Sequence, residues 1–283
     1  WNKKILNTEF MIADSYGENY VSTISLALLD DSGWYKVDYT KAQQLPWGHK
    51  KGCGFLDEKC IVTKKKGSRT LITNTFSEFC TAYDEETCSV THTFRGICGV
   101  RKYQSIPKDY QYFEDNSTGG WTDFGEYCPY PVEWMDPVKF VPNGSCRNGI
   151  QIRKELGEKI CENCRCFISN LVKDSLYKNK MKKSYDSNRA ACYDSRCSVR
   201  DGKLTLIVII NDDEIVCPHG GGSISVDGYK GFIECPKVET VCFGNMNPNS
   251  DISSSSGYSL FSHLTEKIMN MLYSFVYSFS KKN

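Results

Sequence analysis

Fifteen cysteines in a chain of 283 residues constrain the fold more than any other feature of this sequence. All of them fall between Cys53 and Cys242. Apolar residues make up 40% of the chain, which is enough for an ordinary core, so the cysteines are not needed to replace one. Cysteine at this density indicates an oxidising compartment, where disulfides form and persist. The sequence therefore predicts an extracellular or cell-surface protein.

The odd number of cysteines leaves one without a partner among the other fourteen. That cysteine is free, pairs with another chain, or pairs with a part of the protein outside this sequence. The order of the loops favours local pairs, and we expect Cys80 to pair with Cys98 and Cys217 with Cys235. The chain starts at Trp1 without a targeting segment, which favours a carboxy-terminal fragment of a secreted protein.

Charge and short sequence motifs narrow the partners. Lys and Arg number 35 against 34 Asp and Glu, so no cationic surplus is available for a nucleic-acid partner. Two sequons, at Asn116 and Asn143, lie among turn-forming residues and predict glycosylation on surface loops.

Organisation along the chain follows the cysteines. Residues 20–29 carry apolar side chains at helical spacing, and Gly33 is suited to end that helix, which we expect to dock by its apolar face. The cysteine-rich middle part is rich in turn residues and predicts a loop-rich, disulfide-stapled and mostly β domain. Its clearest strands are residues 204–210 and 224–226. The predicted fold class is α+β.

The end of the chain contains no cysteine. Residues 246–257 are rich in Ser and Asn and predict a linker, and residues 258–283 predict an amphipathic helix. The uncharged stretch in this helix is too short to span a bilayer, so the segment is expected to lie on a membrane surface or on another domain, or to be a modified remnant of a lipid-anchor signal.

Chemistry that the chain could perform alone is scarce. Only four histidines occur, and the HExxH zinc motif is absent. Residues 218–222, Pro-His-Gly-Gly-Gly, resemble an esterase oxyanion loop, but no nucleophile elbow accompanies them, and a glycine-rich hairpin loop is preferred. Cys161 and Cys164 have the spacing of a redox motif, and Cys166 adds a third thiolate for a metal. No fourth ligand lies nearby in the sequence, so structural disulfide cysteines are preferred.

Several motifs in residues 1–245 resemble one protein family. The chain opens with Trp-Asn-Lys-Lys-Ile-Leu-Asn-Thr-Glu-Phe-Met, and residues 26–36 read Leu-Ala-Leu-Leu-Asp-Asp-Ser-Gly-Trp-Tyr-Lys. Further matching segments follow in order at residues 45–48, 53–60, 96–99, 110–113, 232–236 and 241–245. Together they resemble the leishmanolysin family of zinc metalloendopeptidases, which belongs to the metzincin group and includes the invadolysins.

This resemblance implies roles for particular residues. Trp1 matches the tryptophan directly after the third zinc-binding histidine, so the zinc ligands and HExxH are expected upstream of Trp1. Met11 matches the Met-turn methionine beneath the zinc; without the resemblance, ordinary core packing would be preferred for it. Ile12 and Ala13 would shape a substrate pocket.

The resemblance also extends to the cysteines. The family pattern is compatible with a pair between Cys197 and Cys242. The cysteine that matches Cys53 pairs in the family with one upstream of the third histidine. Cys53 is therefore expected to be half of a disulfide whose other half lies outside this chain, and the remaining fourteen cysteines form an even set.

The implied function is peptide-bond hydrolysis by a zinc-activated water, with protein or peptide substrates. Residues 1–56 would then end the catalytic region with the Met-turn and the following helix, and residues 57–245 would form the cysteine-rich carboxy-terminal domain. This chain alone is expected to be inactive. Two alternatives remain: a non-catalytic adhesion or binding module, and a thiol oxidoreductase that acts through Cys161 and Cys164.

Overall fold

The computed structural model describes residues 2–12, 19–66, 69–81, 85–135, 142–150, 152–177 and 188–242. The chain divides into two compact units, Trp1–Met246 and Asn247–Asn283, and the second unit lies wholly outside the described residues. The expected linker at 246–257 and the expected helix at 258–283 therefore also lie outside them, as does Ala13. No helix in the described ranges combines the length and the apolar character needed to cross a bilayer.

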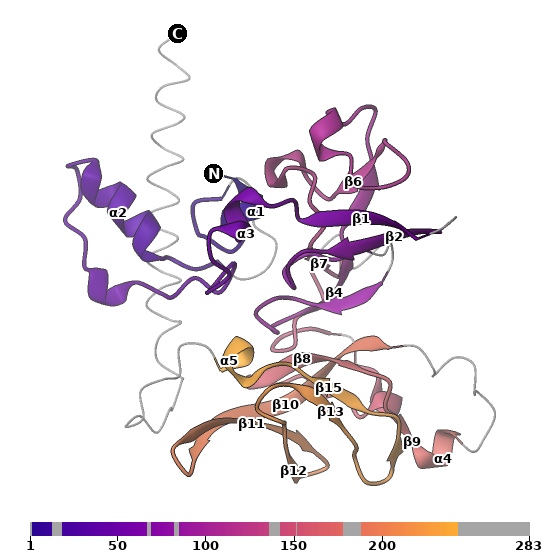
Figure 1. The fold of residues 1–283 in the computed structure, drawn as a ribbon. Coiled ribbons are helices and arrows are strands. Elements are labelled where there is room, and N and C mark those ends of the chain that lie inside the picture. The colour runs from indigo at the N-terminus through magenta and orange to yellow at the C-terminus, as the bar shows by residue number, and fades with distance from the viewer. Residues whose placement is uncertain are drawn as a thin grey trace. The chain divides into compact units, whose positions relative to one another are not determined.

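The first part of the chain is helical (Figure 1). It contains α1 (Lys3–Leu6), α2 (Thr23–Asp31), the 3-10 helix η1 (Tyr39–Lys41) and α3 (Gly54–Asp57). The Ser22 side chain caps α2 by accepting a hydrogen bond from the Ile24 N–H at 3.0 Å. Gly33 follows the helix with a φ of 70°, the left-handed conformation that glycine adopts readily after a helix.

Three small antiparallel sheets follow, built around an aromatic core. They pair β1 (Ile61–Lys66) with β2 (Arg69–Asn74), β4 (Arg95–Cys98) with both β3 (Glu86–Cys88) and β7 (Pro131–Glu133), and β5 (Val100–Lys102) with β6 (Thr118–Gly120). The 3-10 helices η2 (Lys108–Tyr110) and η3 (Asp123–Gly125) lie between these strands in sequence. Trp47 packs edge-on against Phe55, Phe79 and Tyr130, with ring centroids 5.7 to 6.3 Å apart. Residues before and after position 56 therefore share one core.

A six-stranded sheet forms the rest of the described chain. Its order is β12 (Asp213–Val216), β11 (Lys203–Ile210), β10 (Arg189–Arg200), β8 (Cys164–Ser169), β15 (Ile233–Cys235) and β13 (Gly222–Ile224). The remaining elements are η4 (Lys154–Leu156), α4 (Asp174–Tyr177), α5 (Val238–Val241) and the pair of β9 (Val172–Lys173) with β14 (Tyr229–Lys230). Apolar side chains such as Phe167, Leu206, Val208 and Ile233 are fully buried in its core. The fold is α+β, as predicted.

Two expectations about this sheet need correction. The predicted strand at 204–210 is present as β11, but the strand expected at 224–226 is β13, which begins earlier and ends at Ile224. The glycine-rich run at 218–222 is not a hairpin loop, because it connects β12 to β13 at opposite edges of the sheet. The reason is that β13 pairs with β15, a strand later in the chain, rather than with β12.

Seven disulfides join the strands and loops. Cys80 pairs with Cys98, Cys217 with Cys235 and Cys197 with Cys242, the three pairs expected from the sequence. The other four pairs are Cys60–Cys128, Cys88–Cys166, Cys146–Cys192 and Cys161–Cys164. Cys53 is the free cysteine, and it is exposed.

A buried ionic network links the β3–β4–β7 sheet to the six-stranded sheet. Arg95 on β4 is fully buried and donates from Nη1 to both carboxylate oxygens of Glu158 at 3.1 Å. Arg153 bridges Glu158 to Glu86 on β3, and Glu86 also accepts from the backbone N–H of Ala190 on β10. Buried charges are tolerated when they are paired and hydrogen-bonded, as these are.

Candidate functional sites

The turn that contains Met11 is the first candidate site. A parallel bridge joins Glu9 to Tyr20, with the Phe10 N–H donating to the Tyr20 carbonyl at 2.8 Å. Met11 and Ile12 follow this bridge and are half-buried. The structure therefore holds the beginning of this turn, and Ala13 lies beyond the described residues.

Glu9 ties this turn to helix α2. Its carboxylate is completely buried and accepts hydrogen bonds from the Ser22 hydroxyl, from the Ser25 hydroxyl at 2.6 Å and from the Ser22 N–H at 3.2 Å. These donors lie at the amino-terminal end of α2, where the helix dipole also favours a negative charge. Sequence reasoning missed Glu9. The serines at the cap and one turn into the helix indicate that an anion binds there, but they do not identify which carboxylate it is.

The apolar face of α2 is exposed. Ile24 and Leu28 are each 45% accessible, and only Ser25 of the helix is buried. A shallow hollow along the helix is lined by Thr23, Ile24, Ala27, Leu28, Asp31 and Tyr39. The sequence predicted that this face docks, but within the described ranges nothing covers it.

Helix α1 fixes the amino-terminal side of the turn to the aromatic core. The Trp47 indole N–H donates to the Lys4 carbonyl at 2.8 Å, and the Lys4 ammonium lies 3.1 Å from the Glu126 carboxylate. Glu126 also accepts from the Asn2 amide at 2.6 Å. The segment that precedes Met11 is therefore anchored to the part of the chain that carries the disulfides.

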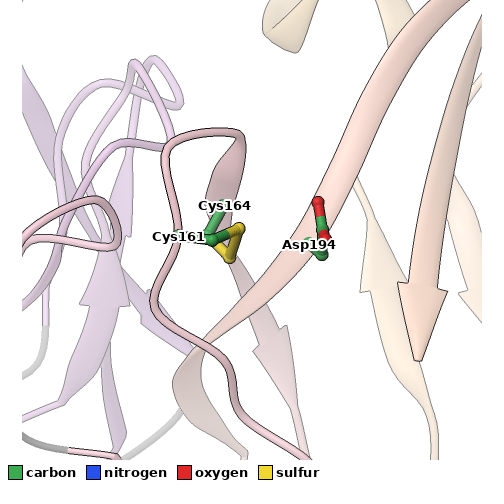
Figure 2. A group of neighbouring side chains, drawn as sticks. All are labelled: Cys161, Cys164 and Asp194. Carbon is green, nitrogen blue, oxygen red and sulfur yellow. A yellow bond between two sulfur atoms is a disulfide. The ribbon is translucent and has the colours of Figure 1, made fainter. Parts of the chain in front are cut away.

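The second candidate is the Cys161–Cys164 pair, shown in Figure 2. Cys164 begins β8, and Asp194 lies on the neighbouring strand β10, with its carboxylate within 4.8 Å of both sulfurs. Lys159 donates to Asp194 at 2.7 Å, and this hydrogen bond raises the pKa of the lysine. The carboxylate next to the sulfurs therefore already has a cationic partner.

This cluster does not fit zinc. The two sulfurs are bonded to each other, and a disulfide offers no thiolate to a metal. Cys166, the third thiolate considered from the sequence, pairs with Cys88. It is the only such cluster among the described residues, and the sequence contains no HExxH motif. The part of the chain that the structure describes therefore shows no cluster that fits zinc.

Redox chemistry at the same pair also finds little support. Cys164 is 1% accessible and Cys161 is half-buried, so an external thiol meets at most one of the two sulfurs. The pair sits at the start of a strand in an antiparallel sheet, whereas redox motifs of this spacing lie near a βαβ unit. A structural disulfide remains the preferred interpretation.

The three histidines that the structure describes lie on separate parts of the chain. His92 donates from Nδ1 to the Cys166 carbonyl at 2.6 Å, and burial lowers its pKa to about 4, so the ring is neutral at pH 7. Burial also lowers the pKa of His49. His219 lies in the connection between β12 and β13. No cluster of metal ligands in the described ranges includes a histidine.

Of the two sequons, Asn116 is exposed in a turn before β6. Asn143 is half-buried, its side-chain oxygen is buried, and its backbone N–H donates to the Trp134 carbonyl at 2.9 Å. Glycosylation at both positions stays a prediction, and Asn116 is the more accessible of the two.

Comparison with known proteins shows that the sequence of this chain is similar to one protein family. The sequence profile described as leishmanolysin matches residues 1–248. The chain is 28% identical over 257 residues to a leishmanolysin of Leishmania tropica, covering 87% of this chain and 36% of that protein. It is 26% identical over 274 residues to a leishmanolysin-like peptidase of Drosophila melanogaster, covering 86% and 38%. The chain thus spans less than two fifths of the length of these two relatives.

Proposed function

Because the chain belongs to the leishmanolysin family, we propose that it forms the carboxy-terminal part of a secreted or cell-surface zinc metalloendopeptidase. The observation that carries this proposal is the family match over residues 1–248, which includes the turn at Met11. Its substrates are proteins or peptides. Its cofactor is zinc, held by residues that precede the Met-turn and that this chain does not contain.

The first part of the chain completes the catalytic unit in this proposal. Met11 provides an apolar, polarizable floor beneath the zinc, and Ile12 and Ala13 shape the pocket for the residue after the scissile bond. Glu9 positions this turn through its hydrogen bonds to Ser22 and Ser25. Since the chain contributes neither metal ligand nor general base, it is inactive by itself.

Two exposed features of residues 1–56 support the proposal that this part contacts a further region of the protein. The apolar face of α2 is open at Ile24 and Leu28, and Cys53 carries a free, exposed thiol. A contiguous exposed apolar face is typical of a surface that is covered in the complete assembly. We propose that the zinc-binding region covers α2 and supplies the disulfide partner of Cys53.

The coding sequence upstream of Trp1 tests the proposal. We expect an HExxH motif and a histidine codon directly before the tryptophan. An upstream sequence in which the motif has lost its histidines or glutamate would contradict the peptidase and would favour the non-catalytic binding module instead.

Disulfide mapping of the full-length protein tests the role of Cys53 separately. Peptide mass spectrometry under non-reducing conditions should join Cys53 to a cysteine encoded upstream of Trp1. A bond between Cys53 and any other cysteine of the present chain would contradict this assignment, and it would leave the peptidase proposal itself untouched.

A further inference from the structure

The loop that follows the 3-10 helix η3 has an unusual backbone conformation. Thr122 caps η3 by accepting a hydrogen bond from the Phe124 N–H at 3.2 Å. Glu126 and Tyr127 come directly after the helix, and their φ values are 55° and 58°. Left-handed φ values are uncommon for residues other than glycine, and they persist where the surrounding contacts fix them. The contacts of this loop should therefore explain its conformation.

Glu126 contacts the first residues of the chain. Its Oε1 accepts a hydrogen bond from the Asn2 side-chain amide at 2.6 Å, and its Oε2 lies 3.1 Å from the Lys4 ammonium. The Lys4 side chain is 6% exposed and the Glu126 side chain 27%. Charges that are shielded from water attract each other more strongly than charges at an open surface. The carboxylate thus joins two parts of the chain with a sequence separation of 124.

Both partners of Glu126 organise helix α1. The Asn2 Oδ1 caps the helix by accepting a hydrogen bond from the Lys4 N–H at 2.8 Å. The Lys4 ammonium also donates to the Leu56 carbonyl at 3.2 Å, where α1 lies beside α3 (Figure 1). Lys4 is buried, and a buried ammonium that loses its counter-charge is strongly destabilised. One carboxylate therefore fixes both the cap and the first turn of α1.

The Cys60–Cys128 disulfide joins the two segments that contact the Lys4 ammonium. Cys128 lies two positions after Glu126, and Cys60 lies four positions after Leu56. Both cysteines are fully buried. The disulfide is therefore expected to hold the Glu126 carboxylate and the Leu56 carbonyl together as a preformed binding site for the ammonium.

Helix α1 is connected to the turn at Met11 by further hydrogen bonds. The Glu9 N–H donates to the Leu6 carbonyl at 3.0 Å, and the Phe10 N–H donates to the Tyr20 carbonyl at 2.8 Å. The residues between α1 and Met11 therefore have little freedom to absorb a shift of the helix. A displacement of α1 should reach the turn.

We propose that Glu126 is a positioning residue: it holds α1, and through α1 the turn at Met11, in the arrangement that peptide hydrolysis requires. The inference rests on the proposed function, in which this turn borders the active site. It adds that the cysteine-rich part of the chain controls the geometry of the active site through one carboxylate. Glu126 acts through Asn2 and Lys4 and does not itself contact the substrate.

Hydrogen exchange in the full chain tests whether Glu126 holds α1. Glu126→Gln keeps the shape of the side chain and removes its charge, so the Lys4 ammonium stays buried without a counter-charge. Exchange at the amides of residues 4–9 should accelerate about tenfold, as expected from the loss of a charged hydrogen bond, while the six-stranded sheet keeps its protection. The matched control is Glu114→Gln, at an exposed carboxylate in the same part of the chain, and it should change neither region.

A double variant separates the ion pair from the conformation of the loop. Lys4→Met replaces the ammonium by an apolar side chain of similar length. Combined with Glu126→Gln, it should return exchange at residues 4–9 to within about threefold of the wild type, because no buried charge is then left unpaired.

Steady-state kinetics of the full-length protein, with the region upstream of Trp1 present, test the positioning role. With a quenched fluorescent peptide as substrate, Glu126→Gln should lower kcat about tenfold and change KM less than about twofold, because misplaced reacting groups slow the chemical step more than they weaken binding. The double variant with Lys4→Met should recover most of the lost kcat. Glu114→Gln should keep the wild-type kcat.

Failure of this proposal is distinguishable from failure of the proposed function. Unchanged exchange at residues 4–9 in Glu126→Gln, or faster exchange throughout the sheet, would contradict the positioning role. So would an unchanged kcat, or a double variant that recovers nothing. A wild-type full-length protein that hydrolyses no peptide would contradict the proposed function instead, and the exchange experiment would still decide whether Glu126 holds α1.

Discussion

The six-stranded sheet and helix α2 differ in how far their apolar side chains are exposed to solvent. In the sheet, Leu206 and Val208 are fully buried, and disulfides join its strands to neighbouring loops. In α2, Ile24 and Leu28 are each 45% accessible. Burying a leucine side chain contributes about 1.5 to 3 kcal/mol to the free energy of folding. The sheet gains this contribution at its buried side chains, whereas α2 lacks much of it at Ile24 and Leu28.

This difference indicates what each region depends on. The sheet obtains its core from residues of this chain, and its stability is expected to depend on no surface supplied by another chain or region. Helix α2 is held at one end by Glu9, while Ile24 and Leu28 on its apolar face remain exposed. The comparison therefore supports the proposal that the first part of the chain belongs to a larger catalytic unit.

Removing disulfides should produce the largest effect. The Cys88–Cys166 bond closes a loop with a sequence separation of 78, whereas Cys161–Cys164 closes one of 3. From loop entropy, replacing both cysteines by Ala should cost about 4.5 kcal/mol for the first pair and about 1.5 kcal/mol for the second. Denaturant unfolding of the two variants measures the difference. Equal losses in the free energy of unfolding would contradict the expectation that the Cys161–Cys164 disulfide contributes less to stability than Cys88–Cys166.

Truncating one leucine in each region tests the comparison directly. Leu206→Ala removes a fully buried side chain and should lower the free energy of unfolding by about 3 kcal/mol. Leu28→Ala, in the chain by itself, should change it by less than about 0.5 kcal/mol. If Leu28→Ala proves as costly as Leu206→Ala under denaturant, α2 is already buried in this chain and the comparison is wrong.

Lowering the pH should reduce the free energy of unfolding of the protein because of His92. The pKa of this histidine is lowered to about 4 by burial, so the unfolded chain binds a proton below its ordinary pKa of 6.5 while the folded chain does not. Stability should therefore fall as the pH drops from 6.5 towards 4, by about 2 kcal/mol from this group. His92→Asn, which tolerates the positive φ of 59° at this position, should remove that part of the decline. If His92→Asn leaves the dependence of stability on pH unchanged, His92 is not the group that causes the decline.

Apart from Leu28→Ala, Glu9→Gln should change the free energy of unfolding least among these variants, and its main effect should be local to α2. The change removes the charge from hydrogen bonds that hold α2, at a cost of about 1 kcal/mol. Hydrogen exchange at the amino-terminal turn of α2 should accelerate, while the six-stranded sheet keeps its protection. Glu239→Gln, at an exposed carboxylate in α5, serves as the control and should leave both regions unchanged. Faster exchange throughout the sheet would contradict a local role.

The sequence predicted those features that depend on neighbouring residues. The run of β-branched residues and leucines at 204–210 is sufficient to identify β11. Cys80–Cys98 and Cys217–Cys235 each span a separation of only 18, so pairing by loop order identified them. The Cys197–Cys242 pair, with a separation of 45, was expected only from the family resemblance.

Features that depend on distant residues were not predictable in this way. The glycine run at 218–222 resembles a hairpin loop locally, but the partner of β13 is β15, later in the chain. Glu9 cannot be distinguished by residue type from a surface carboxylate, because its partners Ser22 and Ser25 lie on another element. The same holds for Arg95 and Glu158, which form a buried pair across a sequence separation of 63.

Metal analysis is the most direct test of the central claim, that this chain completes a zinc peptidase without binding the zinc. The chain would be produced with its disulfides formed, equilibrated with zinc, desalted and measured by mass spectrometry of the metal. We expect far less than one zinc per chain. One tightly held zinc per chain would contradict the claim, because a metal site would then lie within this chain.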